Sequence, residues 1–213
     1  QKREGMIQWR EFLVAAILLA IPVGLIARQP DLGTALLVLA AGFYVIFLAG
    51  LSWKVLLTLF IAVGASLPLL WSFLHDYQRE RVMMLIDPTS DPLGKGFHII
   101  QSTIAVGSGG LAGKGWLQGT QTHLEFIPER TTDFIFAVVG EELGLLGTLL
   151  VLSLLAALIY SIFKIALRCK DPMSRYVGAG IGCWIAVQTV LNVGSATSVL
   201  PVVGVTLPFV SYG

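Results

Sequence analysis

The chain has 213 residues, of which 55% are hydrophobic and only 13% carry a charge, and its formal net charge is +1. Soluble domains average about 25% charged residues, so this composition excludes an ordinary soluble domain and is typical of a membrane protein. We expect membrane lipid as a partner and no nucleic acid.

Three apolar stretches come first, and each is close to the length of a transmembrane helix. They are Leu13–Ala27, Leu32–Gly50 and Val55–Leu74. The turn between the first two contains Pro30 and Asp31. Because Pro30 keeps the residue before it out of a helix, we interpret Asp31 as the cap of the helix that follows.

A polar, glycine-rich loop then runs from Asp76 to Thr132. Within it, residues 97–106 predict a short amphipathic helix, which would either lie along the membrane interface or pack as a satellite helix. Its predicted apolar face carries Phe97, Ile100, Ile104 and Ala105, with His98, Gln101 and Ser102 away from it. The spacing of the three histidines matches no metal site, and we predict none.

The glycine-rich run 107–115 does not match a phosphate-binding P-loop, because Gly115 stands where that motif needs Ser or Thr after Lys114. Two interpretations remain. Free backbone N–H groups and the Lys114 cation suit an anion such as pyrophosphate. A glycine-rich connection with no ligand explains the same residues equally well.

Acidic residues recur every four positions at the end of this loop, at Glu125, Glu129 and Asp133, and a hydrophobic helix is predicted to begin at Phe134. Asp133 could cap that helix, or it could act as a catalytic carboxylate, since both roles exploit a helix terminus. Glu141 and Glu142 lie deeper in the same helix, where a charge rarely lacks a function.

Two further apolar stretches, Phe134–Phe163 and Val177–Val193, complete the predicted spans. In the last one, Gln188, Asn192 and Ser195 share a face that we expect to point into the helix bundle. Gly178, Gly182 and Ala186 form a stripe of small residues for close helix contact. This stripe would contact either another span of the same chain or a helix of a partner.

These elements predict an all-α polytopic membrane protein with about five transmembrane helices, of which the chain is a fragment. We divide it into a three-span bundle (1–74), a large periplasmic loop with short amphipathic helices (75–132), and two spans with the start of a Pro-rich segment (133–213). With a cytoplasmic N-terminus, the inner segments carry eight basic and three acidic residues, and the outer side carries six and ten. The positive-inside rule then puts the large loop outside.

Several collinear motifs resemble the SEDS family (shape, elongation, division and sporulation). They are Gln29-Pro30-Asp31-Leu32-Gly33-Thr34, Asp87-Pro88, Asp91-Pro92-Leu93-Gly94, Gly113-Lys114-Gly115, Leu124-Glu125-Phe126, Thr132-Asp133-Phe134, Gly140-Glu141-Glu142-Leu143-Gly144 and Ser211-Tyr212-Gly213. The motif at 91–94 and the run 109–116 resemble the rod-shape member of the family more than its cell-division relative.

The resemblance implies a peptidoglycan glycosyltransferase that polymerises lipid II at the outer face of the bacterial cytoplasmic (inner) membrane during cell elongation. It implies a class B penicillin-binding protein as partner. Because this partner has a single membrane helix, the resemblance favours the interpretation in which the stripe at Gly182 is a docking surface for that helix. The family's proposed catalytic aspartate falls on Asp133, and a further acidic residue falls on Glu125. Relatives usually have His where Thr131 stands, so no proton transfer through that position is expected here.

Leaving pyrophosphate needs cations or N–H donors, and Lys114 and Arg130 are the local candidates. We therefore expect Glu125, Lys114, Arg130 and Asp31 to contact substrate. No cofactor is required by the sequence, although a divalent cation is compatible with it. A flippase or carrier for polyprenyl-linked sugars, with Asp31, Gln188 and Asn192 along its path, is the alternative function, and a membrane scaffold is a third.

Overall fold

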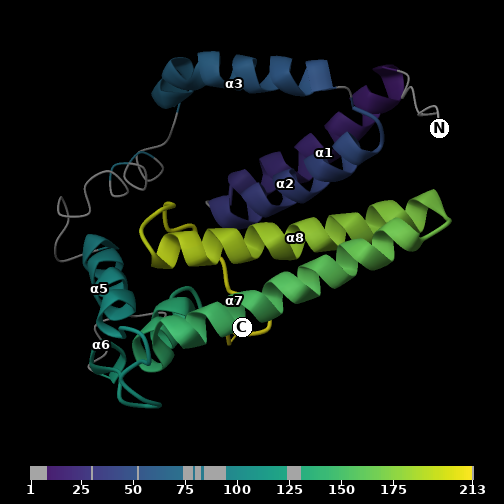
Figure 1. The fold of residues 1–213 in the computed structure, drawn as a ribbon. Coiled ribbons are helices and arrows are strands. Elements are labelled where there is room, and N and C mark those ends of the chain that lie inside the picture. The colour runs from purple at the N-terminus through teal and green to yellow at the C-terminus, as the bar shows by residue number, and fades with distance from the viewer. Residues whose placement is uncertain are drawn as a thin grey trace. The chain divides into compact units, whose positions relative to one another are not determined.

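The computed structural model describes residues 9–29, 31–51, 53–73, 79, 83, 95–123 and 131–212. Within these ranges every regular element is a helix, which confirms that the fold is all-α (Figure 1). The helices are α1 (Trp9–Ala27), α2 (Leu32–Leu48), α3 (Trp53–Phe73), α5 (Lys95–Ser108), α6 (Thr120–His123), α7 (Ile135–Arg168) and α8 (Pro172–Ala196).

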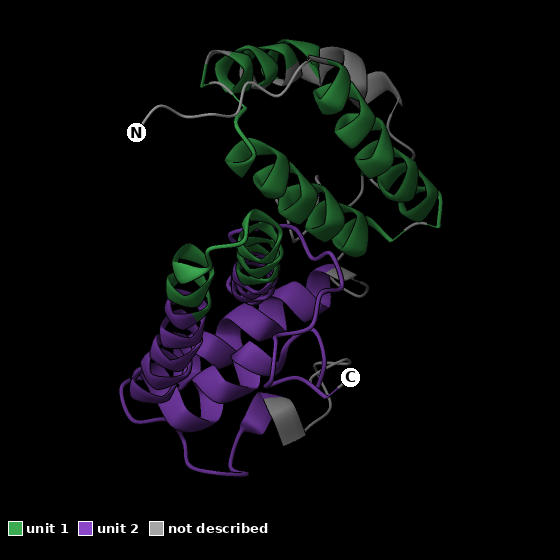
Figure 2. Ribbon diagram, turned by 90° about the vertical axis from the view of Figure 1, so that its right-hand side faces the viewer, with its two compact units in different colours: residues 1–79, 162–184 green, residues 80–161, 185–213 purple. Residues whose placement is uncertain are grey.

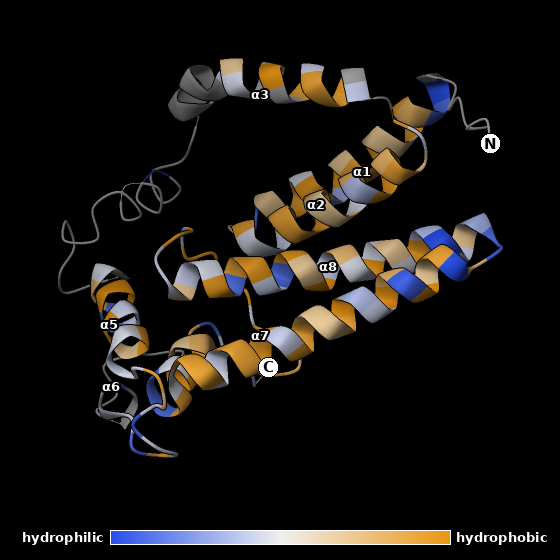
Figure 3. Cartoon of the chain, viewed as in Figure 1, coloured by the Kyte–Doolittle hydropathy of each residue, from blue (hydrophilic) through white to orange (hydrophobic). Residues whose placement is uncertain are grey.

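Each of the five predicted apolar stretches contains a helix, and hydrophobic residues are frequent along these helices (Figure 3). Three helices in the described part of the chain are long and apolar enough to cross a membrane, namely Arg10–Ala27, Ile135–Arg168 and Pro172–Ala196. Leu32–Leu48 and Val55–Ser66 are shorter apolar helices. Rows of exposed leucines along α7, such as Leu146, Leu150 and Leu154, are the surface that a helix presents to lipid.

The chain divides into two compact units (Figure 2). Unit 1 comprises residues 1–79 and 162–184, and unit 2 comprises residues 80–161 and 185–213. In unit 1, α1 packs along α2. The backbone N–H of Thr34 donates to Asp31 Oδ1 at 3.0 Å, which confirms Asp31 as the cap of α2.

The small residues of α8 in unit 1 face α7 of the same chain. A Cβ added to Gly178 would lie 3.0 Å from Ala166 Cβ, and one added to Gly182 would lie 3.1 Å from the Phe163 ring. The ring of Phe163 also meets Tyr44 of α2 edge-on, with centroids 6.0 Å apart. The stripe is therefore an internal helix contact, which is the first of the two interpretations that the sequence allowed.

In unit 2, helix α5 forms where the sequence predicts it, but its predicted apolar face is wrong. The buried face carries Ile99, Ser102 and Ala105, whereas Ile104 is 45% exposed. Ser102 turns inward because its hydroxyl donates to the backbone carbonyl of Ala196 at 2.8 Å. A satisfied polar group at a helix contact can replace an apolar one, so hydrophobicity alone gave the wrong rotation.

Candidate functional site

Asp133 lies two residues before the first residue of α7, in a turn that the C-terminal segment holds in place. We define this segment as Val199–Tyr212. Three successive backbone carbonyls of the turn accept hydrogen bonds. Thr131 accepts from the Tyr212 N–H at 2.9 Å, Thr132 from the Ser211 hydroxyl at 2.7 Å, and Asp133 from the Asn192 side-chain amide at 2.9 Å.

The partly buried carboxylate of Asp133 borders Gly204 of the C-terminal segment. A Cβ added to Gly204 would lie 3.6 Å from Asp133 Oδ2. Gly204 has a φ of 71° and is exposed, a conformation that disfavours any larger residue. The glycine thus leaves space beside the carboxylate, next to solvent.

A second acidic residue, Glu141, lies one and a half turns into α7 and is fully buried. Its Oε1 accepts from the Lys114 ammonium at 2.7 Å, from the Gln121 N–H at 2.9 Å and from the Thr120 hydroxyl at 3.2 Å. The ammonium also donates to Thr120 at 2.9 Å. A buried carboxylate needs such partners, so Glu141 anchors the loop segment to α7.

The backbone of α7 is broken at Gly144, which has φ 65° and ψ −160°. This conformation removes the two helical hydrogen bonds that would join residues 141 and 142 to residues 145 and 146. The loop segment, defined as Gly109–Gln121, bonds all four of the freed groups. Two N–H groups of the loop segment donate to α7, Lys114 to the Glu141 carbonyl and Gly115 to the Glu142 carbonyl, both at 3.0 Å. Two N–H groups of α7 donate to the loop segment, Leu145 to the Gly110 carbonyl at 2.9 Å and Leu146 to the Leu111 carbonyl at 3.1 Å.

This exchange of hydrogen bonds requires glycine at the points of closest approach. A Cβ on Gly113 would overlap the carbonyl oxygen of Glu142, one on Gly109 would overlap that of Gly140, and one on Gly144 would overlap the backbone nitrogen of Gly113. Irregular backbone at the depth of a membrane helix persists only where other protein groups satisfy it, and the loop segment does so here.

The glycine-rich run is therefore a bonded connection to α7. The N–H of Gly113 donates to Gly109, and those of Lys114 and Gly115 donate to α7, so these three amides are not available to an anion. The Lys114 ammonium donates to Glu141 and to Thr120, which uses two of its three N–H donors, and the lysine side chain is 28% exposed. A contact between Lys114 and substrate stays a prediction.

The other predicted site residues divide between the units or lie outside the description. Asp31 belongs to unit 1, where it caps α2. Glu125 and Arg130 lie outside the described residues. Sequence reasoning missed Thr120, because a single hydroxyl residue in a polar segment has no pattern. Ser211 belongs to one of the motifs, but the motif did not indicate its contact with the turn at Asp133. The signal for Asn192 was present, since a polar side chain in a span is expected to face protein.

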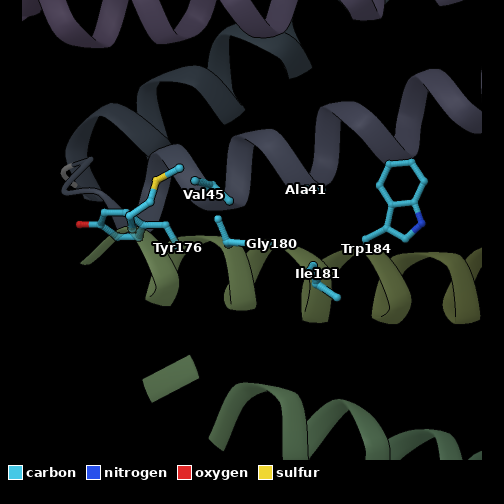
Figure 4. Close-up of a pocket in the computed structure, with 8 residues that line it drawn as sticks. Ala41, Val45, Tyr176, Gly180, Ile181 and Trp184 are labelled. Carbon is cyan, nitrogen blue, oxygen red and sulfur yellow. The ribbon is translucent and has the colours of Figure 1, made fainter. Parts of the chain in front are cut away.

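Unit 1 contains an apolar groove of about 490 Å³ between α2 and α8 (Figure 4). Its lining residues are Ala41, Val45, Met173, Tyr176, Val177, Gly180, Ile181 and Trp184. None of these lining residues is a carboxylate, a histidine or a lysine, and Tyr176 is the one that can donate a proton from oxygen. The candidate chemical site is therefore the Asp133 turn in unit 2.

Long apolar helices with a polar segment bonded into one of them define a helical membrane protein whose candidate site lies at a helix terminus. Residues 1–213 match the family model FTSW_RODA_SPOVE, which describes cell cycle proteins. The chain belongs to this family, and the SEDS assignment made from the motifs is confirmed.

Curated relatives support the same assignment. The chain is 55% identical to the peptidoglycan glycosyltransferase MrdB of Escherichia coli K12 over 94% of its own length and 54% of the relative's. It is 38% identical to MrdB of Helicobacter pylori strain 26695 (96% and 53%) and 38% identical to a probable peptidoglycan glycosyltransferase FtsW of Geobacter metallireducens (92% and 52%). The chain thus spans about half the length of these relatives.

Solved structures agree with this fold. A chain from a study of polymerization and crosslinking by a peptidoglycan synthase complex superposes with a TM-score of 0.78 at 39% identity, covering 100% of this chain and 58% of that one. The crystal structure of the Thermus thermophilus rod shape determining protein RodA superposes with a TM-score of 0.61 at 29% identity, covering 100% and 52%.

Proposed function

We propose that the protein containing this chain is a peptidoglycan glycosyltransferase that polymerises lipid II into glycan strands during cell elongation. The observation that carries the proposal is the 55% identity, across 94% of the chain, to a protein named as a peptidoglycan glycosyltransferase. The motif at 91–94 and the run 109–116, which resemble the rod-shape member of the family, support a role in elongation rather than division.

We assign the role of general base to Asp133. Glycosyl transfer joins the hydroxyl of one lipid-linked sugar to the anomeric carbon of another, which carries pyrophosphate. The carboxylate takes the hydroxyl proton while the new C–O bond forms and the C–O bond to pyrophosphate breaks, and the lipid-linked pyrophosphate leaves with the bonding electrons. Such base catalysis contributes about 10²–10⁴ in rate, and inversion at the anomeric carbon follows by analogy with base-assisted glycosidases.

Two features of the Asp133 turn support this role. The backbone is held at three successive carbonyls, so the carboxylate has a fixed origin, and a base must be held in place to be efficient. The exposed Gly204 beside it offers space for an incoming sugar. In this proposal, Glu125, Lys114, Arg130 and Asp31 contact substrate, with the cations serving the leaving pyrophosphate.

The proposed setting is the bacterial cytoplasmic membrane, crossed by five helices of this chain, with residues 75–132 on the periplasmic side. The division of charge supports this orientation, because the short inner segments hold most of the Lys and Arg residues. A class B penicillin-binding protein is the proposed partner, since a structural relative comes from a study of a complex that couples polymerization to crosslinking.

The alternative, a carrier for polyprenyl-linked sugars, needs polar residues along a path through the membrane. Two of its three candidate residues have structural partners instead. The Gln188 amide donates to Thr206 at 3.4 Å, and the Asn192 amide donates to two backbone carbonyls. These contacts favour the enzyme.

The test is polymerisation of purified lipid II by the full-length protein with its partner, comparing wild type with Asp133→Asn. Asn keeps the size of Asp and still caps a helix, so it removes only the base. We expect glycan synthesis to be lost while the protein stays folded. Asp171→Asn is the matched control, because Asp171 caps α8, accepting from the Ser174 N–H at 2.8 Å, and lies outside the Asp133 turn. Near-normal turnover by Asp133→Asn would transfer the role of base to another residue, first Glu125.

A further inference from the structure

Asn192 is a fully buried residue of α8 whose side-chain amide makes two hydrogen bonds within unit 2. Its Nδ2 donates to the carbonyl oxygen of Asp133 at 2.9 Å and to that of Val205 at 2.8 Å. Both N–H donors of the amide are used, each on a different segment. The Oδ1 atom of Asn192 has no hydrogen-bond partner within the described residues.

The two carbonyl groups belong to the two segments that flank the Asp133 carboxylate. One is the turn before α7, and the other is the C-terminal segment, whose Gly204 lies beside Oδ2 of Asp133. Val205 is the residue next to Gly204 in the chain. One side chain therefore sets the distance between the carboxylate and the backbone that lines the adjacent space.

We propose that Asn192 is a positioning residue for glycosyl transfer, which holds Asp133 and the segment 204–205 in the arrangement that lets the carboxylate reach the acceptor hydroxyl. This inference rests on the proposed function of Asp133. Asn192 touches no substrate atom itself. Its effect passes through the backbone of the turn. The hydrogen bond fixes the backbone carbonyl of Asp133, and this in turn fixes the point from which the Asp133 side chain extends.

The direction of the hydrogen bonds makes the proposal testable through pH. Both acceptors are carbonyl oxygens, so position 192 must supply donors. A protonated carboxyl group at this position can donate one hydrogen bond, whereas an ionised carboxylate has none to donate and would face two carbonyl oxygens.

The experiment compares Asn192→Asp, Asn192→Leu and wild type in lipid II polymerisation by the full-length protein with its partner. For Asn192→Leu, which donates nothing, we expect kcat to fall on the order of 10- to 100-fold with little change in KM. For Asn192→Asp, we expect the ratio of its kcat to that of wild type to fall as pH rises, because the introduced carboxyl group loses the proton that it donates. Returning the same sample to the lower pH should restore the rate.

Thr189→Val is the matched control. Thr189 is another buried polar residue of α8, but its hydroxyl donates to Ile185 of its own helix at 2.8 Å. This variant removes a buried polar group without touching the Asp133 turn, and its kcat should follow wild type at every pH. The kcat ratio of Asn192→Asp to wild type is measured on one folded sample as pH is raised and lowered again. This result therefore stands even if Asn192→Leu fails to fold.

A constant ratio for Asn192→Asp across pH, or a wild-type kcat for Asn192→Leu, would overturn the positioning role. Neither outcome would bear on the proposed base, which Asp133→Asn tests in the same assay. Conversely, full turnover by Asp133→Asn would refute the base and, with it, the positioning role of Asn192.

Discussion

Lys114 and Glu141 are joined twice, once through their backbones and once through their side chains. The Lys114 N–H donates to the Glu141 carbonyl oxygen at 3.0 Å, and the Lys114 ammonium meets Glu141 Oε1 at 2.7 Å. The carboxylate is fully buried, whereas the lysine side chain is 28% exposed. The pair therefore fixes the loop segment to α7, and the two partners should respond differently to mutation.

Lys114→Met should destabilise the protein more than Glu141→Gln. Without Lys114 a buried carboxylate loses its countercharge, at a cost of up to about 3 kcal/mol, whereas a lysine without Glu141 can be hydrated. The measurement is the thermal midpoint of detergent-solubilised protein. The double variant Lys114→Met/Glu141→Gln should recover stability relative to Lys114→Met.

The same double variant tests whether Lys114 contacts substrate. Recovery of lipid II polymerisation along with stability would make Lys114 a structural residue only. A stable double variant with a raised KM would support the predicted contact with pyrophosphate.

Gly113→Ala should weaken the attachment of the loop segment, with Gly110→Ala as its control. Both glycines have positive φ, 80° and 56°, so both substitutions incur backbone strain of roughly 1–2 kcal/mol. Only at Gly113 does the added Cβ overlap a carbonyl oxygen of α7, because nothing lies within 4 Å of a Cβ on Gly110. A lower thermal midpoint is expected for Gly113→Ala, and equal midpoints for the two variants would contradict the described contact.

Gly182→Leu should reduce stability by disturbing the contact between α7 and α8 in unit 1. The added side chain would meet Phe163 and Ile162, and overpacking of this kind costs typically about 1–3 kcal/mol. Gly24→Leu in α1 is the control, since a Cβ there meets nothing within 4 Å. Unchanged stability with weaker co-purification of the penicillin-binding partner would instead return this stripe to a docking role.

The proposed orientation predicts the labelling of single cysteines by a membrane-impermeant reagent in intact cells. In a background without Cys169 and Cys183, a cysteine replacing Thr89 should react, whereas one replacing Ser174 should not. Thr89 belongs to the predicted periplasmic loop, and Ser174 belongs to the basic inner segment. The reverse pattern would invert the whole topology.

Asp171 should contribute a small, pH-dependent stabilisation of α8. The Ser174 backbone N–H, and then its hydroxyl, hold the pKa of this carboxyl below its usual value. A lowered pKa gives a contribution that is present above the ordinary pKa of an aspartate and is lost as pH falls through the folded-state pKa. The difference in thermal midpoint between wild type and Asp171→Asn should therefore shrink on acidification, and a difference that grows would contradict the contact.

Hydrophobic patterning predicted the helices well, because each apolar stretch has only one way to satisfy its backbone in a membrane. The cap at Asp31 was also predictable, since capping is a local interaction between neighbouring residues. The rotation of α5 was not, because Ser102 is buried by a bond to Ala196, 94 residues away in the chain.

The candidate site shows the same limit. Motifs pointed to Asp133, but the turn around it is supported by Asn192, 59 residues after Asp133, and by Ser211, 79 residues after Thr132. Likewise, the glycines at 109 and 113 could be interpreted as a flexible connection or an anion site. The break at Gly144 explains why the backbone at these two glycines must lie so close to the backbone of α7. The sequence alone does not show this break.

The break in α7 also determines how this region opens. Since four hydrogen bonds join the loop segment to α7 at this break, releasing the segment would remove all four at once. Partial release is therefore disfavoured, and opening is cooperative. Amide hydrogens at Lys114, Gly115, Leu145 and Leu146 should exchange with solvent deuterium at one common rate, as a single structural unit drawn from two distant parts of the chain.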